Sequence, residues 1–195
     1  MNILFLDIET TGLNPYSNQI LQVSARFDKD GDEISSFNRM IAMSKPVSAS
    51  AMVSNPMLAS QVSLGALKVN RRSILNNLEG MSESGALEQF LDWIVELATK
   101  YDKFVVCGHN VHFDINFLKQ RSLYLGYSDF DDLFGHRYLD TATIGLYLME
   151  KGVLPIEKAG IDNLVEYFGL NNEKLHDSEI DIELTANIYY AMLEL

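Results

Sequence analysis

An Asp-Gly turn between two apolar runs places the strongest constraint on how this chain folds. Residues 20–27 and 33–41 are rich in the residue types that strands favour, and residues 28–32 between them spell DKDGD. Asp-Gly tolerates the positive φ that a tight hairpin requires, so the two runs are predicted to pair as antiparallel strands. Residues 3–8 form an earlier apolar run, and we therefore expect a meander of three strands.

The rest of the chain alternates helix-like and strand-like patterns. Helical spacing of apolar residues predicts helices over residues 86–100, 113–125, 140–150, 161–168 and 178–193, and short apolar runs predict strands over 104–107 and 137–139. Residues 43–84, rich in Ser, Asn, Met and Ala, are predicted to form short helical turns and loops. This order of elements predicts an α/β fold with a mixed sheet and helices on its faces.

Length, charge and cysteine content exclude several classes of protein. With 195 residues, the chain is expected to form a single domain. A net charge of −12 argues against coating duplex DNA by bulk charge, but it permits a small site that grips one strand end. Cys107 is the single cysteine, which excludes a disulfide framework and suits a reducing compartment. The longest apolar run, residues 188–193, is far shorter than a membrane span, and we expect a cytoplasmic protein without a signal peptide.

Two acids lie at the end of the first predicted strand. Asp7 and Glu9 are two residues apart, so their side chains share one face of that strand, whereas Ile8 points to the other. Carboxylates placed side by side repel each other, and burying them is costly unless they are paired or bind a metal. This pattern alone fits a metal site and a solvated strand end equally well.

Two further segments carry polar residues where strands or loops lead into helices. Residues 109–114 spell HNVHFD, and Asp114 falls in the first turn of a predicted helix, where such a residue often only caps the helix. His176 precedes the last predicted helix, and Asp181 falls on its apolar side with Leu184 and Ile188. An Asp in that position is expected to bind a cation or pair with one, whereas His176 alone is more typical of a surface or capping residue.

Together the acids indicate one catalytic cleft. Asp7, Glu9, Asp114 and Asp181 would supply the hard oxygen ligands that Mg²⁺ or Mn²⁺ prefers. Two such ions about 3.5–4 Å apart can activate water and stabilise the leaving oxygen of a phosphodiester. His176 could take the proton of the attacking water near neutral pH.

These three motifs resemble those of the DEDDh, or DnaQ-like, 3′–5′ exonucleases of the ribonuclease-H-like superfamily. The matching segments are DIETTGL at residues 7–13, HNVHFD at residues 109–114, and a His and an Asp separated by four residues, at 176 and 181. The resemblance implies a five-stranded sheet, with three antiparallel strands followed by two parallel ones, and two divalent ions. It also implies hydrolysis of single-stranded DNA or RNA from the 3′ end to nucleoside monophosphates.

The resemblance also implies roles for individual residues. Asp7, Glu9 and Asp181 would hold the tighter metal, Asp7 would bridge to the second ion with help from Asp114, and His176 would be the general base. The residues expected to bind or shape the substrate site are Thr11, Leu13, His109, Asn110 and Phe113. Asp140-Thr141 resembles a recurrent pair of the family, although the position of Asp140 by itself predicts a helix cap.

Several alternatives stay open at the level of sequence. A docking or proofreading subunit that acts through a polymerase partner, and an RNA-trimming exoribonuclease, fit the same motifs. An apolar stretch at residues 40–57 is either a homodimer surface or core. Lys68, Arg71 and Arg72 are either solvated loop charges or contacts to substrate phosphates.

Overall fold

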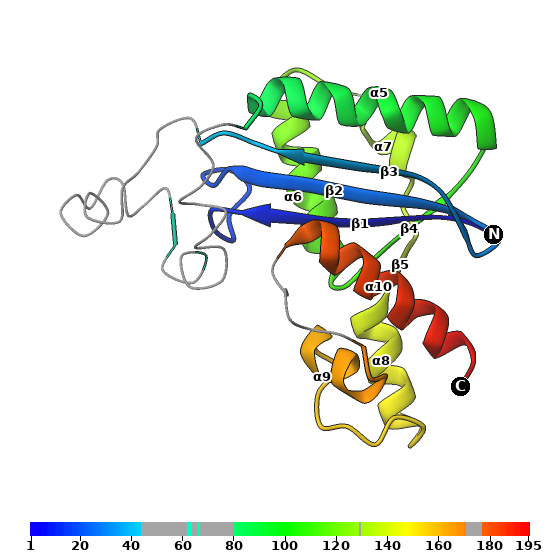
Figure 1. Ribbon diagram of the computed structural model, residues 1–195. Helices are drawn as coiled ribbons and strands as arrows, with labels where there is room; N and C mark the ends of the chain where they lie inside the picture. The colour runs from blue at the N-terminus through cyan, green and yellow to red at the C-terminus, as the bar shows by residue number, and fades with distance from the viewer. Residues whose placement is uncertain (44–61, 64–65, 67–79, 129, 171–176) are drawn as a thin grey trace.

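A five-stranded mixed sheet forms the centre of the protein (Figure 1). The computed structural model describes residues 1–43, 62–63, 66, 80–128, 130–170 and 177–195. The strands, in the spatial order β3-β2-β1-β4-β5, are β1 (Asn2–Thr10), β2 (Ile20–Lys29), β3 (Asp32–Met40), β4 (Val105–Gly108) and β5 (Tyr138–Asp140). Strands β1, β2 and β3 pair antiparallel, whereas β4 pairs parallel with both β1 and β5. The predicted arrangement of three antiparallel strands followed by two parallel ones is confirmed.

The predicted hairpin joins β2 to β3. Lys29 pairs with Asp32, which leaves Asp30 and Gly31 as a two-residue loop. Both loop residues have positive φ, 54° for Asp30 and 98° for Gly31. This is the backbone that a tight hairpin loop needs and that Asp-Gly supplies at low steric cost.

Helices cover both faces of the sheet, as expected (Figure 1). On one face lie α5 (Glu83–Tyr101), α6 (Val111–Tyr124) and α7 (Phe130–Phe134), and on the other lie α8 (Thr141–Glu150), α9 (Ile161–Tyr167) and α10 (Ser178–Leu193). The predicted helices agree with five of these within a few residues. Helix α7 was not predicted because five residues are too few to show a helical period.

Strand β1 contacts a different set of helices with each of its faces. Leu4, Leu6 and Ile8 pack into the core that α5, α6 and α7 cover. Ile3 and Phe5 instead pack against α10. This alternation decides where the acids at the end of the strand point.

Part of the predicted irregular segment over residues 43–84 lies outside the described residues, namely 44–61, 64–65 and 67–79. The apolar stretch at 40–57 is likewise described only as far as residue 43. Within the described part of the chain, every helix falls short of the length and apolar character needed to cross a membrane.

Candidate active site

The end of β1 brings together three of the predicted carboxylates. Asp7 and Glu9 continue the face of β1 that carries Ile3 and Phe5, so they point toward α10. Asp181 lies in the first turn of α10 and is only 7% exposed. Carboxylate oxygens of Asp7, Glu9 and Asp181 all lie within 4.8 Å of one another. The predicted convergence of the first and third motifs is therefore present in the fold.

Asp114 approaches the same strand end from the opposite side. It lies in the first turn of α6, is 3% exposed, and its Oδ1 accepts the backbone N–H of Ile8 at 3.0 Å. Strand β4 pairs with β1 only as far as Phe5, so this N–H lies beyond the parallel ladder. Asp114 thus fixes the end of β1 next to Asp7 and Glu9, rather than merely capping its own helix.

Burial and mutual repulsion perturb these acids strongly. Burial raises the pKa of Asp7 well above its usual value, and the charges of Asp114, Glu9, Asp181 and Asp177 raise it further. Burial also raises the pKa of Asp114, although the N–H of Ile8 opposes that rise. A cation would relieve the repulsion, so this donor set of hard oxygens fits a divalent metal ion.

Polar residues on β2 and β3 hold the N-terminus of α10 beside the acids. Ser24, which pairs with Asp7 across the strands, has its hydroxyl 2.6 Å from that of Ser178. Gln22, opposite Glu9, donates to Asp177 Oδ1 at 3.2 Å. Asn38 Nδ2 donates to Glu179 at 2.7 Å.

These anchoring residues were not predicted from the sequence. A signal was nevertheless present, because Gln22 and Ser24 begin a run of polar residues at alternating positions of this strand that continues with Arg26 and Asp28. Those positions face the same side of the sheet as Asp7 and Glu9.

Residues at the start of α8 fix the backbone of the second motif, residues 109–114. Asp140 caps α8, as predicted, by accepting the N–H of Ala142 at 2.9 Å, and the same Oδ1 accepts the N–H of Asn110 at 3.0 Å. Asn110 itself has the left-handed φ of 64°. One carboxylate therefore fixes both the helix start and the turn that precedes α6.

His109 is oriented by the residue next to Asp140. The Thr141 hydroxyl donates to the Gly108 carbonyl at 3.2 Å and lies 3.0 Å from His109 Nδ1. Burial lowers the pKa of His109 despite the opposing charges of Asp140 and Asp162, so the neutral ring is favoured.

The other predicted substrate-site residues differ in exposure. Thr11 is buried and its Oγ1 accepts the N–H of Gln19 at 3.0 Å, whereas Leu13 is 81% exposed. Phe113 is partly buried, with its ring centroid 5.0 Å from that of Phe117. His176, the predicted general base, and Lys68, Arg71 and Arg72 lie outside the described residues.

Comparison with known families identifies this arrangement. A family model described as exonuclease, that of ribonuclease T, matches residues 4–189. The chain belongs to this exonuclease family. The match spans all the predicted motifs, and the family is DnaQ-like with a ribonuclease-H-like fold. Exonucleases of this family generally use divalent metal ions, in keeping with the acidic cluster at the end of β1.

Two kinds of curated relative resemble this exonuclease. The PolC-type DNA polymerase III of Thermotoga petrophila is 23% identical over 190 residues, which are 97% of this chain and 12% of that protein. The oligoribonuclease of Vibrio campbellii is 22% identical over 143 residues, which are 73% of this chain and 72% of that protein. The chain thus spans only about an eighth of the length of its polymerase relatives.

Solved structures share the fold. Exonuclease I of E. coli in complex with single-stranded DNA superimposes with a TM-score of 0.73 at 18% identity, covering 98% of this chain and 40% of that one. The nuclease domain of 3′hExo, described as a DEDDh family member and bound to rAMP, gives 0.66 at 16% identity, covering 99% and 92%.

Proposed function

We propose that residues 1–195 form a single DEDDh-type exonuclease domain that hydrolyses single-stranded nucleic acid from the 3′ end. The observation that carries the proposal is the cluster of Asp7, Glu9 and Asp181 oxygens within 4.8 Å. The products are nucleoside monophosphates, and DNA is favoured slightly over RNA. The polymerase relatives, of which that of Thermotoga petrophila matches 97% of the chain, support the preference for DNA.

The acids at the end of β1 are the proposed metal ligands. Asp7, Glu9 and Asp181 would hold one divalent ion, Mg²⁺ or Mn²⁺, and Asp7 together with Asp114 would help to hold a second. Two ions bound there would polarise the scissile phosphate and stabilise the leaving oxygen. The raised pKa values of Asp7 and Asp114 support this assignment, because such pKa shifts cluster at functional sites.

His176 is the proposed general base that takes the proton of the attacking water. Its support is its place in the sequence, two residues before α10 and five before Asp181. An imidazole has an ordinary pKa near 6.5, which suits proton transfer near neutral pH. The anchoring of the α10 N-terminus by Gln22, Ser24 and Asn38 would hold the chain that follows His176 in place.

The terminal nucleotide is proposed to lie against the turns that flank the acids. Leu13 offers an exposed apolar side chain for contact with a base, and Thr11 shapes the buried part of that turn. Phe113 would form the opposite wall. His109 and Asn110 would position this second turn through their bonds to Thr141 and Asp140.

Degradation of labelled oligonucleotides tests the proposal directly. Matched single-stranded DNA and RNA, labelled at the 5′ end, are incubated with Mg²⁺, with Mn²⁺ and with chelator. We expect a ladder that shortens from the 3′ end with either metal, and no ladder with chelator. No shortening of either substrate under any metal would contradict the proposal.

Two histidine variants distinguish the loss of the proposed general base from a nonspecific effect of replacing a histidine. His176→Ala should reduce turnover by about 10²–10⁴-fold, the usual contribution of a general base. His136→Ala removes an exposed histidine outside the proposed site and serves as the matched control. Equal activity of the two variants would remove His176 from the mechanism.

A second candidate is a proofreading role beside a polymerase, as a docking subunit or as part of a longer chain. The observation that favours it is the match to about one eighth of the PolC-type polymerases. An RNA-trimming role is the corresponding alternative suggested by the oligoribonuclease relative. Full activity of the isolated chain on short RNA, exceeding that on DNA, would favour the trimming role.

A further inference from the structure

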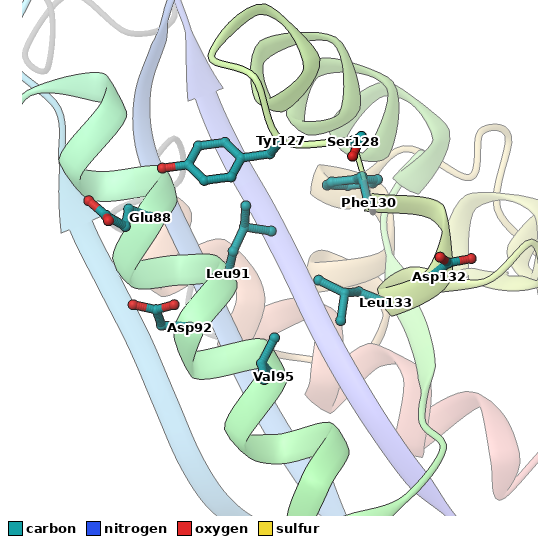
Figure 2. A pocket seen from close by; sticks show the side chains of 9 residues that line it. All are labelled: Glu88, Leu91, Asp92, Val95, Tyr127, Ser128, Phe130, Asp132 and Leu133. Atoms are coloured by element: carbon teal, nitrogen blue, oxygen red, sulfur yellow. The ribbon is translucent and has the colours of Figure 1, made fainter.

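A groove lies between α5 and the turn that leads into α7, on the face of the sheet opposite α10. It has a volume of about 340 Å³. Figure 2 shows Leu91 and Val95 of α5 pointing toward Tyr127 and Leu133 across it. Phe130 is buried, whereas Val95 is 46% exposed, so the groove has a closed floor and an accessible apolar wall.

Three carboxylates surround this apolar surface. Glu88 and Asp92 lie on the exposed side of α5, and Asp132 lies on α7 across the groove (Figure 2). Within the described residues, no ion pair engages any of the three. Neighbouring acids do form ion pairs: Asp131 pairs with Lys119 at 2.5 Å, and Glu83 pairs with Arg121. The rim of the groove therefore carries negative charge that the described residues leave without an ion pair.

A second hollow of about 340 Å³ adjoins the groove. It shares Asp132 and Leu133 with the groove and is also lined by Ala98, Asp102 and Lys103. From Glu88 to Ala98, helix α5 rises by about 15 Å, at 1.5 Å per residue. That length corresponds to about three turns of a docked helix, which is longer than a small apolar ligand needs.

We propose that this groove docks a basic amphipathic segment of another protein, with apolar side chains on the groove floor and Lys or Arg residues against Glu88, Asp92 and Asp132. Helix-in-groove recognition uses apolar anchors in this way, and opposite charge at the rim sets orientation and association rate. Nucleic acid fits poorly, because its phosphates would meet three carboxylates. A symmetric contact with a second copy fits poorly too, because a two-fold interface places the same patch on both sides and opposes like charges.

The probe is a model peptide of alternating Leu and Lys blocks. A control peptide carries Glu in place of every Lys. Each peptide is titrated into the full chain by calorimetry, and amide chemical shifts locate its contacts. We expect the Lys peptide to bind and to shift amides of α5 and of residues 127–133, whereas the Glu peptide does not bind. Shifts confined to other surfaces would overturn the proposal.

Charge reversal at matched positions distinguishes peptide binding in the groove from attraction of the peptide by the overall negative charge of the protein. The groove variant combines Glu88→Lys, Asp92→Lys and Asp132→Lys, and the control variant combines Glu96→Lys, Glu150→Lys and Glu157→Lys. All six residues are exposed, and both variants change the net charge from −12 to −6. Binding should weaken at least tenfold in the groove variant and less than twofold in the control.

Equal weakening in the two variants would overturn the proposal. So would a dimer of the unmodified chain in sedimentation that the groove variant abolishes, because the occupant would then be a second copy. Nuclease activity of both variants should be unchanged, since none of the six residues belongs to the proposed active site. This separates failure of the groove from failure of the proposed exonuclease activity.

Discussion

Asp7 faces four other carboxylates, those of Asp114, Glu9, Asp181 and Asp177, in a partly buried position. Its raised pKa means that the fold favours the protonated form over the charged one. In a protein without bound cations, ionisation of Asp7 is therefore destabilising. The same charge is what makes the site a strong ligand for a divalent ion.

Replacement of Asp7 by asparagine removes this charge while keeping the shape of the side chain. In chelator at pH 8, we expect Asp7→Asn to stabilise the fold by about 0.5–2 kcal/mol, which corresponds to about 2–4 °C in Tm per kcal/mol for a chain of this size. Nuclease activity in Mg²⁺ should be abolished. Thermal melts with chelator and the oligonucleotide assay measure the two effects.

The pH dependence of that gain follows from linkage. A carboxyl whose pKa is raised by folding leaves the native state more protonated than the unfolded one, so stability falls as the pH rises from the unfolded pKa through the folded pKa. The advantage of Asp7→Asn should therefore vanish below about pH 4, near the ordinary pKa of Asp, and grow toward neutral pH. Asp32→Asn, on an exposed residue, is the control and should show no such trend. A Tm gain independent of pH would refute the electrostatic explanation.

At the scale of elements, α10 is placed by strands rather than by helices alone. Its N-cap residue, Asp177, and its first turn hydrogen-bond to β2 through Gln22 and Ser24 and to β3 through Asn38. Further along, Arg26 of β2 donates to Glu183 at 2.6 Å. Asp181 is thus held opposite Asp7 by a polar seam between the helix and the sheet.

The contact between Ser24 and Ser178 offers a test of this seam. Both residues are fully buried and their hydroxyl oxygens lie 2.6 Å apart. We expect Ser24→Ala to destabilise the fold by about 1–3 kcal/mol, because it removes the partner of the buried Ser178 hydroxyl. Ser178→Ala should cost less, because the Ser24 hydroxyl keeps its bond to Asn38 Oδ1 at 3.3 Å. The double variant should cost less than the sum, with a coupling of about 0.5–3 kcal/mol measured by denaturant unfolding. Strict additivity would show that the two hydroxyls do not stabilise the helix start together.

Local sequence patterns predicted most elements of this fold, and contacts distant in sequence explain what they missed. Asp7 and Glu9 were placed on one face by the two-residue period of a strand, and Asp140 was recognised as a cap from its position before a helix. The second bond of Asp140, to the N–H of Asn110, depends on β4 and β5 lying side by side, which no local pattern encodes. The same applies to the bond between Thr141 and His109.

At the scale of the whole molecule, a net charge of −12 opposes the approach of a polyanion. Substrate binding must then depend on cations gathered locally rather than on the overall field. Lys68, Arg71 and Arg72 form a compact group of cations in the sequence. Whether they contact substrate phosphates stays a prediction, since they lie outside the described residues.

Neutralising all three residues to alanine should weaken single-strand binding and reduce its dependence on salt. Each lost phosphate contact on a single strand reduces the magnitude of the negative slope of log K against log salt by about 0.7. Loss of all three contacts should therefore reduce that magnitude by about 2. The control variant removes three exposed cations elsewhere, Lys100, Lys151 and Lys158. Anisotropy titrations of a DNA oligonucleotide in Ca²⁺ across a salt series measure both slopes. An unchanged slope would leave these residues as solvated loop charges.

The two faces of β1 contact different helices, and this limits which insertions and deletions the strand can accept. Leu4, Leu6 and Ile8 face one set of helices, while Ile3, Phe5, Asp7 and Glu9 face the other. Deleting or inserting a single codon within residues 3–6 would turn the acids into the apolar layer under α5 and α6 and expel leucines toward α10. A change of two codons would preserve both faces. Length variants of this strand that keep a working nuclease are therefore expected to differ by even numbers of residues.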